Sequence, residues 1–251
     1  TGGVLRKAFS WTYESLSQGG TLADLATREA GRLTRTVLTA LEHLNTLTDF
    51  DHTAFGSSHQ VIGVDEVGRG PLAGPLVACC VQLPYPAAVN LPFLRDSKKL
   101  QADEREFLVT RIEECAVQIG YGVVEAHEFG KELNLHQLTF LAMQRAVEQV
   151  EVPPERFALL VDGKFPLPQW TGLQKAVIKG DDTSLSVAAA SVLAKVYRDR
   201  RMMELHDRYP VYNFGQHVGY GTAFHRQAIL EHGPCPEHRS NFLVKILTGS
   251  Q

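Results

Sequence analysis

The sequence is poor in cysteine, has no long uninterrupted apolar run and carries no large excess of either charge. No two of its four cysteines, Cys79, Cys80, Cys115 and Cys235, have Cys-x-x-Cys spacing. This argues against a zinc site or a disulfide framework and favours reduced thiols. No stretch approaches the roughly 20 apolar residues that cross a bilayer, and no signal peptide is recognisable. We therefore expect a protein of the cytoplasm without membrane association.

The formal net charge is −3 over 251 residues. A nucleic-acid partner usually requires a basic surface, but the distribution of charge matters more than its sum. Acids that hold divalent ions are counted as negative although the bound ions reverse the local sign. The length suits one large domain, or one domain with a small appendage.

The first 58 residues differ in pattern from the rest. Thr21-Leu-Ala-Asp24 fits a capping box, and apolar residues at helical spacing follow it. This predicts one amphipathic helix over Thr21–Leu47 and a polar linker over Phe50–Gln60. We expect residues 1–58 to form a helical N-terminal extension with its linker, and residues 59–251 to form the main domain, which ends in a C-terminal helical segment.

From Gln60 onward, apolar runs typical of strands alternate with segments of helical periodicity, which predicts an α/β domain built on a central sheet. The predicted strands are Val61–Asp65, Leu76–Val81, Val117–Glu125, Phe157–Val161 and Gln174–Ile178. The predicted helices are Glu104–Ala116, Asn134–Val150, Ser184–His206 and a last one, Ala223–Glu231, which Gly233-Pro234 stops.

Acidic residues stand at the ends of several predicted elements. Asp65 and Glu66 follow one apolar strand, Asp162 follows another, and Asp181 with Asp182 precedes a long helix. Adjacent carboxylates at the mouth of a buried strand are unfavourable without a partner. Hard oxygen ligands select Mg²⁺ or Mn²⁺ over zinc, and two such ions about 4 Å apart can cleave a phosphodiester. The alternative for any one acid alone is a turn former or a helix cap.

A second interpretation is a nucleotide-cofactor enzyme, because Gly68-x-Gly70-x-x-Ala73 loosely resembles a dinucleotide fingerprint after a strand. The acids at Asp65 and Glu66 would repel a pyrophosphate there, and Pro71 fits badly where the fingerprint needs a loop that enters a helix.

Several blocks of the sequence resemble, in order, the signature of the ribonuclease HII family over about residues 61 to 242. The blocks are Gly63-Val-Asp65-Glu66-Val-Gly68-Arg69-Gly70-Pro-Leu-Ala-Gly-Pro75, Asp96-Ser97-Lys98-Lys99-Leu100, Val161-Asp162-Gly163, Lys179-Gly180-Asp181, Ala188-Ala-Ala-Ser-Val-Leu-Ala-Lys195-Val, Arg198-Asp199-Arg200, and Gly219-Tyr220-Gly221-Thr222 with His225 downstream.

This resemblance implies a ribonuclease H-like fold, with a central mixed sheet flanked by helices. It also implies that residues 59–251 form the catalytic domain. It implies hydrolysis of RNA in RNA–DNA hybrids and incision 5′ to single ribonucleotides in duplex DNA, leaving 3′-hydroxyl and 5′-phosphate ends. The catalytic, metal-ligating acids would be Asp65, Glu66, Asp162 and Asp181, with Mg²⁺ or Mn²⁺ as cofactor. We expect a monomer. A hybrid-binding module without catalysis is the alternative.

The resemblance also assigns substrate contacts. Gly68, Arg69 and Gly70 match the family segment that senses the ribose 2′-hydroxyl, the group that separates RNA from DNA. Tyr220 matches a tyrosine that packs on the sugar at the RNA–DNA junction, with a core aromatic as the alternative. Lys98 is a predicted phosphate contact, with a solvated turn lysine as the alternative.

Some positions depart from the family or fall outside its motifs. Val218 stands where the family commonly has lysine, which puts one phosphate contact in doubt, and Tyr197 stands where a smaller residue is usual. Asp199 is predicted to be a structural ion-pair residue. Five histidines have no zinc-motif spacing, and we expect most of them at the surface or at helix caps: His206, His217, His225, His232 and His238.

Overall fold

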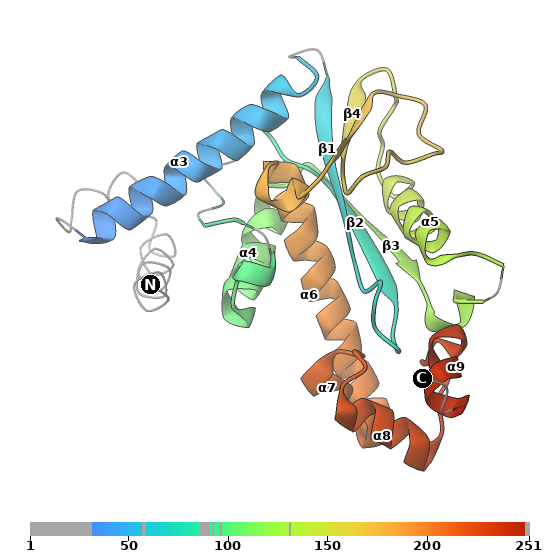
Figure 1. Ribbon diagram of the computed structural model, residues 1–251. Coiled ribbons are helices and arrows are strands. Elements are labelled where there is room, and N and C mark those ends of the chain that lie inside the picture. Colours follow the sequence, from blue (N-terminus) through green and yellow to red (C-terminus); the bar gives the residue numbers. More distant parts are fainter. Residues whose placement is uncertain are drawn as a thin grey trace.

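The computed structural model describes residues 32–56, 59–85, 91, 93–95, 97–130 and 132–248 (Figure 1). The first part of the predicted N-terminal helix, residues 21–31, lies outside the described residues, as does Asp96. No helix in the described part of the chain is both long and apolar enough to span a bilayer.

A mixed five-stranded sheet forms the centre of the fold, as the sequence predicts. Its strands are β1 (Gln60–Val67), β2 (Leu76–Gln82), β3 (Gln118–Val124), β4 (Phe157–Asp162) and β5 (Gln174–Val177). They lie in the order β3-β2-β1-β4-β5. The pairs β1–β2 and β2–β3 are antiparallel, whereas β1–β4 and β4–β5 are parallel. Every residue of β2 is buried, because helices cover both faces of the sheet.

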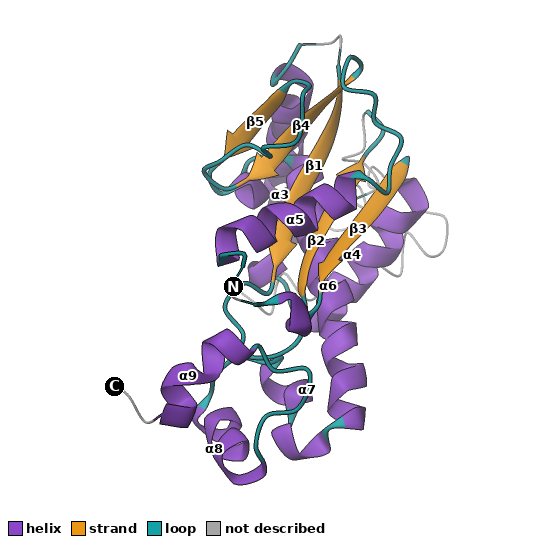
Figure 2. Ribbon diagram, turned by 90° about the vertical axis from the view of Figure 1, so that its right-hand side faces the viewer, coloured by secondary structure: helices purple, strands orange, loops and turns teal. Residues whose placement is uncertain are grey.

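Helices α6 (Leu185–Arg208) and α4 (Ala102–Cys115) cover one face, and α5 (Leu135–Val147) covers the other (Figure 2). Two strand glycines allow the close approach. A Cβ on Gly63 would lie 2.1 Å from the carbonyl carbon of Ser186, and one on Gly122 would lie 1.9 Å from the carbonyl oxygen of Ala142. Both distances are far below contact, so α6 and α5 sit closer to the sheet than any larger residue would permit.

Helix α3 (Arg32–Thr53) continues four residues into the segment predicted as a linker, so the prediction that the linker begins at Phe50 is wrong. The reason is packing, since Leu44 and Leu47 are buried in the same cluster as α6. Further along, the Asp51 carboxylate accepts a 2.8 Å hydrogen bond from the Ser186 N–H at the start of α6. The division of the chain at residue 58 stays a prediction.

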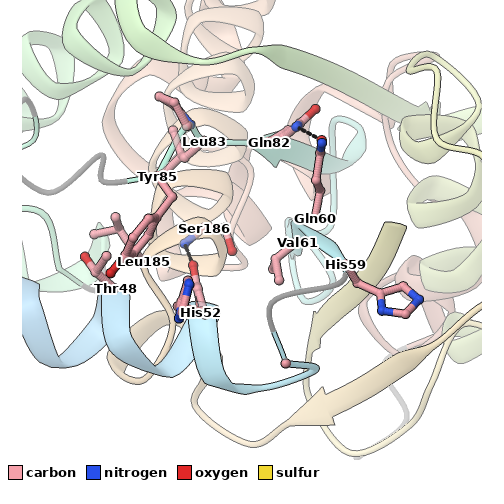
Figure 3. Close-up of a pocket in the computed structure, with 13 residues that line it drawn as sticks. Thr48, His52, His59, Gln60, Val61, Gln82, Leu83, Tyr85, Leu185 and Ser186 are labelled. Atoms are coloured by element: carbon pink, nitrogen blue, oxygen red, sulfur yellow. Dashed lines mark hydrogen bonds between the residues drawn. The ribbon is translucent and has the colours of Figure 1, made fainter. Parts of the chain in front are cut away.

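A pocket of about 380 Å³ lies between the end of α3, the start of β1 and the start of α6. Figure 3 shows His52, Gln60 and Ser186 around it, with the Gln82 amide donating to the Gln60 side-chain oxygen over 2.6 Å. None of the four predicted metal-ligating acids lines this pocket.

The C-terminal region gathers at one end of α6 (Figure 2). It contains α7 (Phe214–His217), α8 (Ala223–His232) and α9 (Ser240–Thr248). Helix α8 matches its predicted range closely, but it is not the last helix, because α9 follows and buries Leu243. Among the described residues, the short 3-10 helices are η2 (Ser97–Lys99), η3 (Ala126–Glu128), η4 (Gly180–Asp182) and η5 (Pro210–Tyr212).

Candidate active site

Three of the four predicted acids meet where β1 and β4 lie side by side. Parallel pairing sets Val64 opposite Val161, so Asp65 and Asp162 reach the same edge of the sheet. One carboxylate oxygen from each of Asp65, Glu66 and Asp162 lies within 4.8 Å of the others. This spacing allows the three side chains to bind one cation.

Asp65 is the most buried member of this acidic group, with 5% of its surface exposed. Its Oδ1 accepts the Glu66 N–H over 2.7 Å, and the Ser191 hydroxyl of α6 also bonds to it. Burial, and then the charges of Glu66 and Asp162, raise the pKa of Asp65 well above its ordinary value. The site therefore concentrates negative charge that its own hydrogen bonds do not offset, and a divalent cation would offset it.

Glu66 has a similar environment with one cationic neighbour. Burial raises the pKa of Glu66, while the Arg69 guanidinium, whose Nη1 lies 3.5 Å from Glu66 Oε1, acts in the opposite direction. Arg69 is partly exposed, with 45% of its side-chain surface in solvent. The Glu66 carboxylate thus lies between the other two acids and Arg69 in the glycine-rich loop.

Asp181 lies next to the acidic group but is not one of its three members. The Gly180 N–H donates to Asp162 Oδ1 over 2.7 Å, which brings η4 against the end of β4. Lys179 adopts a left-handed conformation, with φ at 58°, as the chain turns into η4. Asp181 is buried, and the Lys98 ammonium lies 3.4 Å from its Oδ2. Lys98, whose side chain is 79% exposed, is therefore at the edge of the acidic site.

Two buried arginines, Arg239 and Arg198, donate hydrogen bonds to the backbone of the Gly68–Pro75 loop, and sequence reasoning missed both. Arg239 is fully buried and donates to the carbonyl oxygens of Gly68, Arg69, Pro71 and Gly74 at 2.7–3.2 Å. Because these carbonyls face the arginine, the loop turns its other side outward. Burial lowers the pKa of Arg239 to about 9.

Arg198 of α6 supports the second half of the loop. Its guanidinium donates to the carbonyl oxygens of Pro75 at 2.9 Å, Ala73 at 3.2 Å and Val218 at 3.0 Å. In the sequence, Arg198 interrupts an apolar helical stripe that contains Ala194 and Met202, and this pattern was the available signal for a buried arginine. Arg239 carries no comparable signal.

Tyr220 stands beside this loop rather than in the core. A Cβ on Gly70 would lie 3.7 Å from Tyr220 Cε1, and 46% of the tyrosine is exposed. The core-aromatic alternative is therefore wrong.

Val218, at the position where the family commonly has lysine, is partly buried against an apolar cluster that contains Met202, Phe214 and Ile229. Its φ is 44°.

The expectation for the histidines is wrong for three of the five. His217, His225 and His238 are buried, with rings that lie 4.4–5.2 Å apart in succession. Imidazoles can be buried when both ring nitrogens have hydrogen-bond partners, and spacing along the chain does not reveal such partners. His232 is exposed as expected. Asp199 is confirmed as an ion-pair residue, at 2.7 Å from Lys195 Nζ.

The glycine-rich loop runs from strand β1 into strand β2, not into a helix. A dinucleotide fingerprint requires a strand, a loop and then a helix whose N-terminus receives the pyrophosphate. The nucleotide-cofactor interpretation therefore has the wrong local topology.

Comparison with solved structures identifies the fold. The fold is similar to that of the ribonuclease H2 from Pyrococcus horikoshii, with a TM-score of 0.61 and 24% identity over 72% of this chain and 93% of that one. It is also similar to a Bst-RNase HIII solved in complex with Mn²⁺, with a TM-score of 0.54 and 21% identity over 70% of this chain and 63% of that one. These likenesses show that the chain has a ribonuclease H-like fold.

The family is given by sequence. The family model described as Ribonuclease HII matches residues 62–247. The ribonuclease HII of Syntrophobacter fumaroxidans is 48% identical over 77% of this chain and 81% of its own length, and that of Geobacter metallireducens is 50% identical over 73% and 84%. The chain belongs to the ribonuclease HII family and is a metal-dependent ribonuclease H, an endonuclease that acts on the RNA of RNA–DNA hybrids.

Proposed function

We propose that this enzyme also incises duplex DNA on the 5′ side of single embedded ribonucleotides and leaves 3′-hydroxyl and 5′-phosphate ends. The observation that carries the proposal is the approach of Asp65, Glu66 and Asp162 to within 4.8 Å, next to a loop and a tyrosine suited to read a sugar. We take the protein to act as a cytoplasmic monomer, with residues 59–251 as the catalytic domain.

The four acids are proposed as the ligands of Mg²⁺ or Mn²⁺. The donor set fits such ions, because it consists of carboxylate oxygens alone and gathers charge at a buried site. When bound, the metal supplies an activated water and stabilises the leaving oxygen. Asp181 would join the group from η4, where Gly180 already bonds to Asp162. Lys98, at 3.4 Å from Asp181, would exchange this ion pair for a phosphate oxygen of the substrate.

The Gly68–Gly70 segment is proposed to read the 2′-hydroxyl. Arg239 already occupies the carbonyl oxygens of Gly68 and Arg69, so the backbone N–H groups on the outer side remain for the substrate. The Tyr220 ring beside Gly70 would pack on the following deoxyribose. A ribose at one sugar and a deoxyribose at the next would thus be read by adjacent groups.

The decisive experiment is incision of a labelled DNA duplex that contains one ribonucleotide, with Asp65→Asn compared with the parent enzyme. We expect the variant to lose at least about a hundredfold in rate, because the acidic group loses one charged ligand. Asp103→Asn is the matched control, because Asp103 is exposed in the first turn of α4.

Three outcomes would contradict parts of the proposal. Equal cleavage by the Asn variant would remove Asp65 from the metal site. Binding of the duplex by the parent without cleavage in Mn²⁺ would favour a binding module. Cleavage of RNA–DNA hybrids but not of the duplex with a single ribonucleotide would restrict the enzyme to hybrids. End analysis of the products tests the predicted 3′-hydroxyl.

A further inference from the structure

Two of the three buried histidines, His238 and His225, form a continuous hydrogen-bonded chain that ends on the backbone of Tyr220. The Cys235 N–H lies 3.0 Å from His238 Nδ1, His238 Nε2 lies 3.0 Å from His225 Nε2, and His225 Nδ1 lies 2.9 Å from the Tyr220 carbonyl oxygen. None of these histidines belongs to the acidic site.

The partners at the two ends of the chain determine where each proton lies. A backbone carbonyl can only accept, so His225 Nδ1 carries the hydrogen that bonds to Tyr220. A backbone N–H can only donate, so His238 Nδ1, which faces Cys235 N–H, carries none. Neutral His238 is therefore protonated at Nε2 and donates to the bare Nε2 of His225. A second proton on either ring would set two N–H groups against each other.

His217 completes the arrangement from the other side. The Gly219 N–H donates to His217 Nδ1 over 3.2 Å, which leaves Nε2–H to donate to the Tyr212 carbonyl oxygen over 2.7 Å. The His217 ring stacks on that of His225, with centroids 4.4 Å apart and planes at 19°. Tyr220 N–H donates to the His217 carbonyl over 2.9 Å. The Tyr220 N–H is thus bound to the backbone carbonyl of His217, and the Tyr220 carbonyl to the ring of His225.

The segment before Tyr220 needs this support. Val218 and Gly219 have φ of 44° and 85°, two successive left-handed residues, and this conformation is unfavourable for a β-branched valine. Such a backbone persists only where its surroundings determine it. Here Arg198 binds the Val218 carbonyl, Leu72 N–H binds the Gly219 carbonyl over 2.8 Å, and the histidines bind Tyr220.

We infer that His217, His225 and His238 are positioning residues which, as a neutral relay of fixed tautomers, hold the Tyr220 ring beside Gly70 for sugar recognition. The inference rests on the proposed contact of Tyr220 with the sugar. Burial lowers the pKa of both His225 and His238 to about 4, which agrees with rings that stay neutral during catalysis.

The first test reads the tautomers directly and needs no activity. Long-range ¹H–¹⁵N spectra of the full chain near neutral pH should show His225 protonated at Nδ1, and His217 and His238 protonated at Nε2. Assignment uses single histidine variants. A charged ring, or a proton on His225 Nε2, would overturn the relay whatever the enzyme cleaves.

The second test separates positioning from general structure. His225→Leu should raise KM for the duplex with a single ribonucleotide about tenfold, the effect of one lost buried hydrogen bond, with kcat and hybrid cleavage changed much less. His225→Asn keeps a donor near the Nδ1 position and should recover most of the loss. His232→Leu, an exposed histidine in the same helix, is the control.

In a Tyr220→Ala background, His225→Leu should have no further effect, because the residue it positions is gone. Equal losses in both backgrounds, or no rescue by asparagine, would overturn the inference. If the leucine variant fails to fold, the asparagine variant and the tautomer spectra decide. A parent enzyme that does not incise the duplex would refute the proposed function, while the spectra would still test the relay.

Discussion

Single side chains buried away from the acids control the shape of the Gly68–Pro75 loop. Arg239 illustrates this, because one guanidinium binds four carbonyl oxygens of a loop in which three of the eight residues are glycine. A loop rich in glycine and proline would otherwise have many accessible conformations. At the residue scale, the loop that should read the sugar is therefore ordered by a residue more than 160 positions later in the chain.

We expect Arg239→Met to lower the free energy of unfolding by about 3 kcal/mol, because the change leaves several buried carbonyls without donors. Urea denaturation measures this. Arg226→Met is the control, because Arg226 also donates to a backbone carbonyl, that of Gly221, but is exposed. Its effect should stay within about 0.5 kcal/mol. Equal effects of the two changes would show that the buried bonds of Arg239 have no special role.

The three clustered acids could be predicted from sequence because strand ends are readable from apolar runs, and neighbouring parallel strands bring such ends together. The histidine relay could not. His217 ends α7, His225 lies in α8 and His238 follows α8. Their burial depends on partners such as the Tyr220 carbonyl, which only the folded backbone supplies.

At the scale of elements, the predicted strands and the helices of the main domain agree with the structure to within a few residues. Long periodic segments such as α6 are the easiest to recognise. Helix α9 was missed because it is nine residues long, and a short apolar run does not distinguish helix from strand. The helix α3 was placed correctly in part, but its packing on α6 depends on tertiary contacts of Leu44 and Leu47.

The contact between α3 and α6 leads to a prediction about the division of the chain. We expect Leu47→Ala to lower the free energy of unfolding of the whole enzyme by about 2–4 kcal/mol in a single transition, because Leu47 is 1% exposed. Leu230→Ala, at an exposed position of α8, is the control. An unchanged main transition would mean that α3 unfolds independently of the catalytic domain.

For the molecule as a whole, buried titratable groups act in opposite directions on stability. His225 and His238 have folded-state pKa values of about 4, below the ordinary 6.5, so the unfolded chain binds protons that the fold excludes. Their contribution to stability is complete above pH 6.5 and is lost as the pH falls towards 4. Burial raises the pKa of Asp51 from 3.8 to about 6, so the folded chain binds this proton more tightly than the unfolded chain does. For Asp51, acidification therefore raises stability, opposite to its effect through the histidines.

The histidine contribution can be isolated by difference. Between about pH 7.5 and 4.5, the parent should lose about 2 kcal/mol more free energy of unfolding than His238→Gln, because the variant lacks one of the excluded protons. The acids Asp51, Asp65 and Glu66 are the same in both proteins and cancel. Identical pH slopes for parent and variant would show that His238 accepts its proton in the folded state. Its neighbours His217, His225, Cys235 and Tyr212 are unchanged in the variant.

Helix α6 contacts both the acidic group and the Gly68–Pro75 loop. Ser191 of α6 bonds to Asp65, and seven residues later Arg198 of the same helix bonds to the Gly68–Pro75 loop. At 1.5 Å per residue the two points are roughly 10 Å apart along a rigid rod. For the proposed function, α6 therefore fixes the distance between the acids and the Gly68–Pro75 loop. We expect that changed loop side chains alter which sugar is accepted without changing which bond is cut.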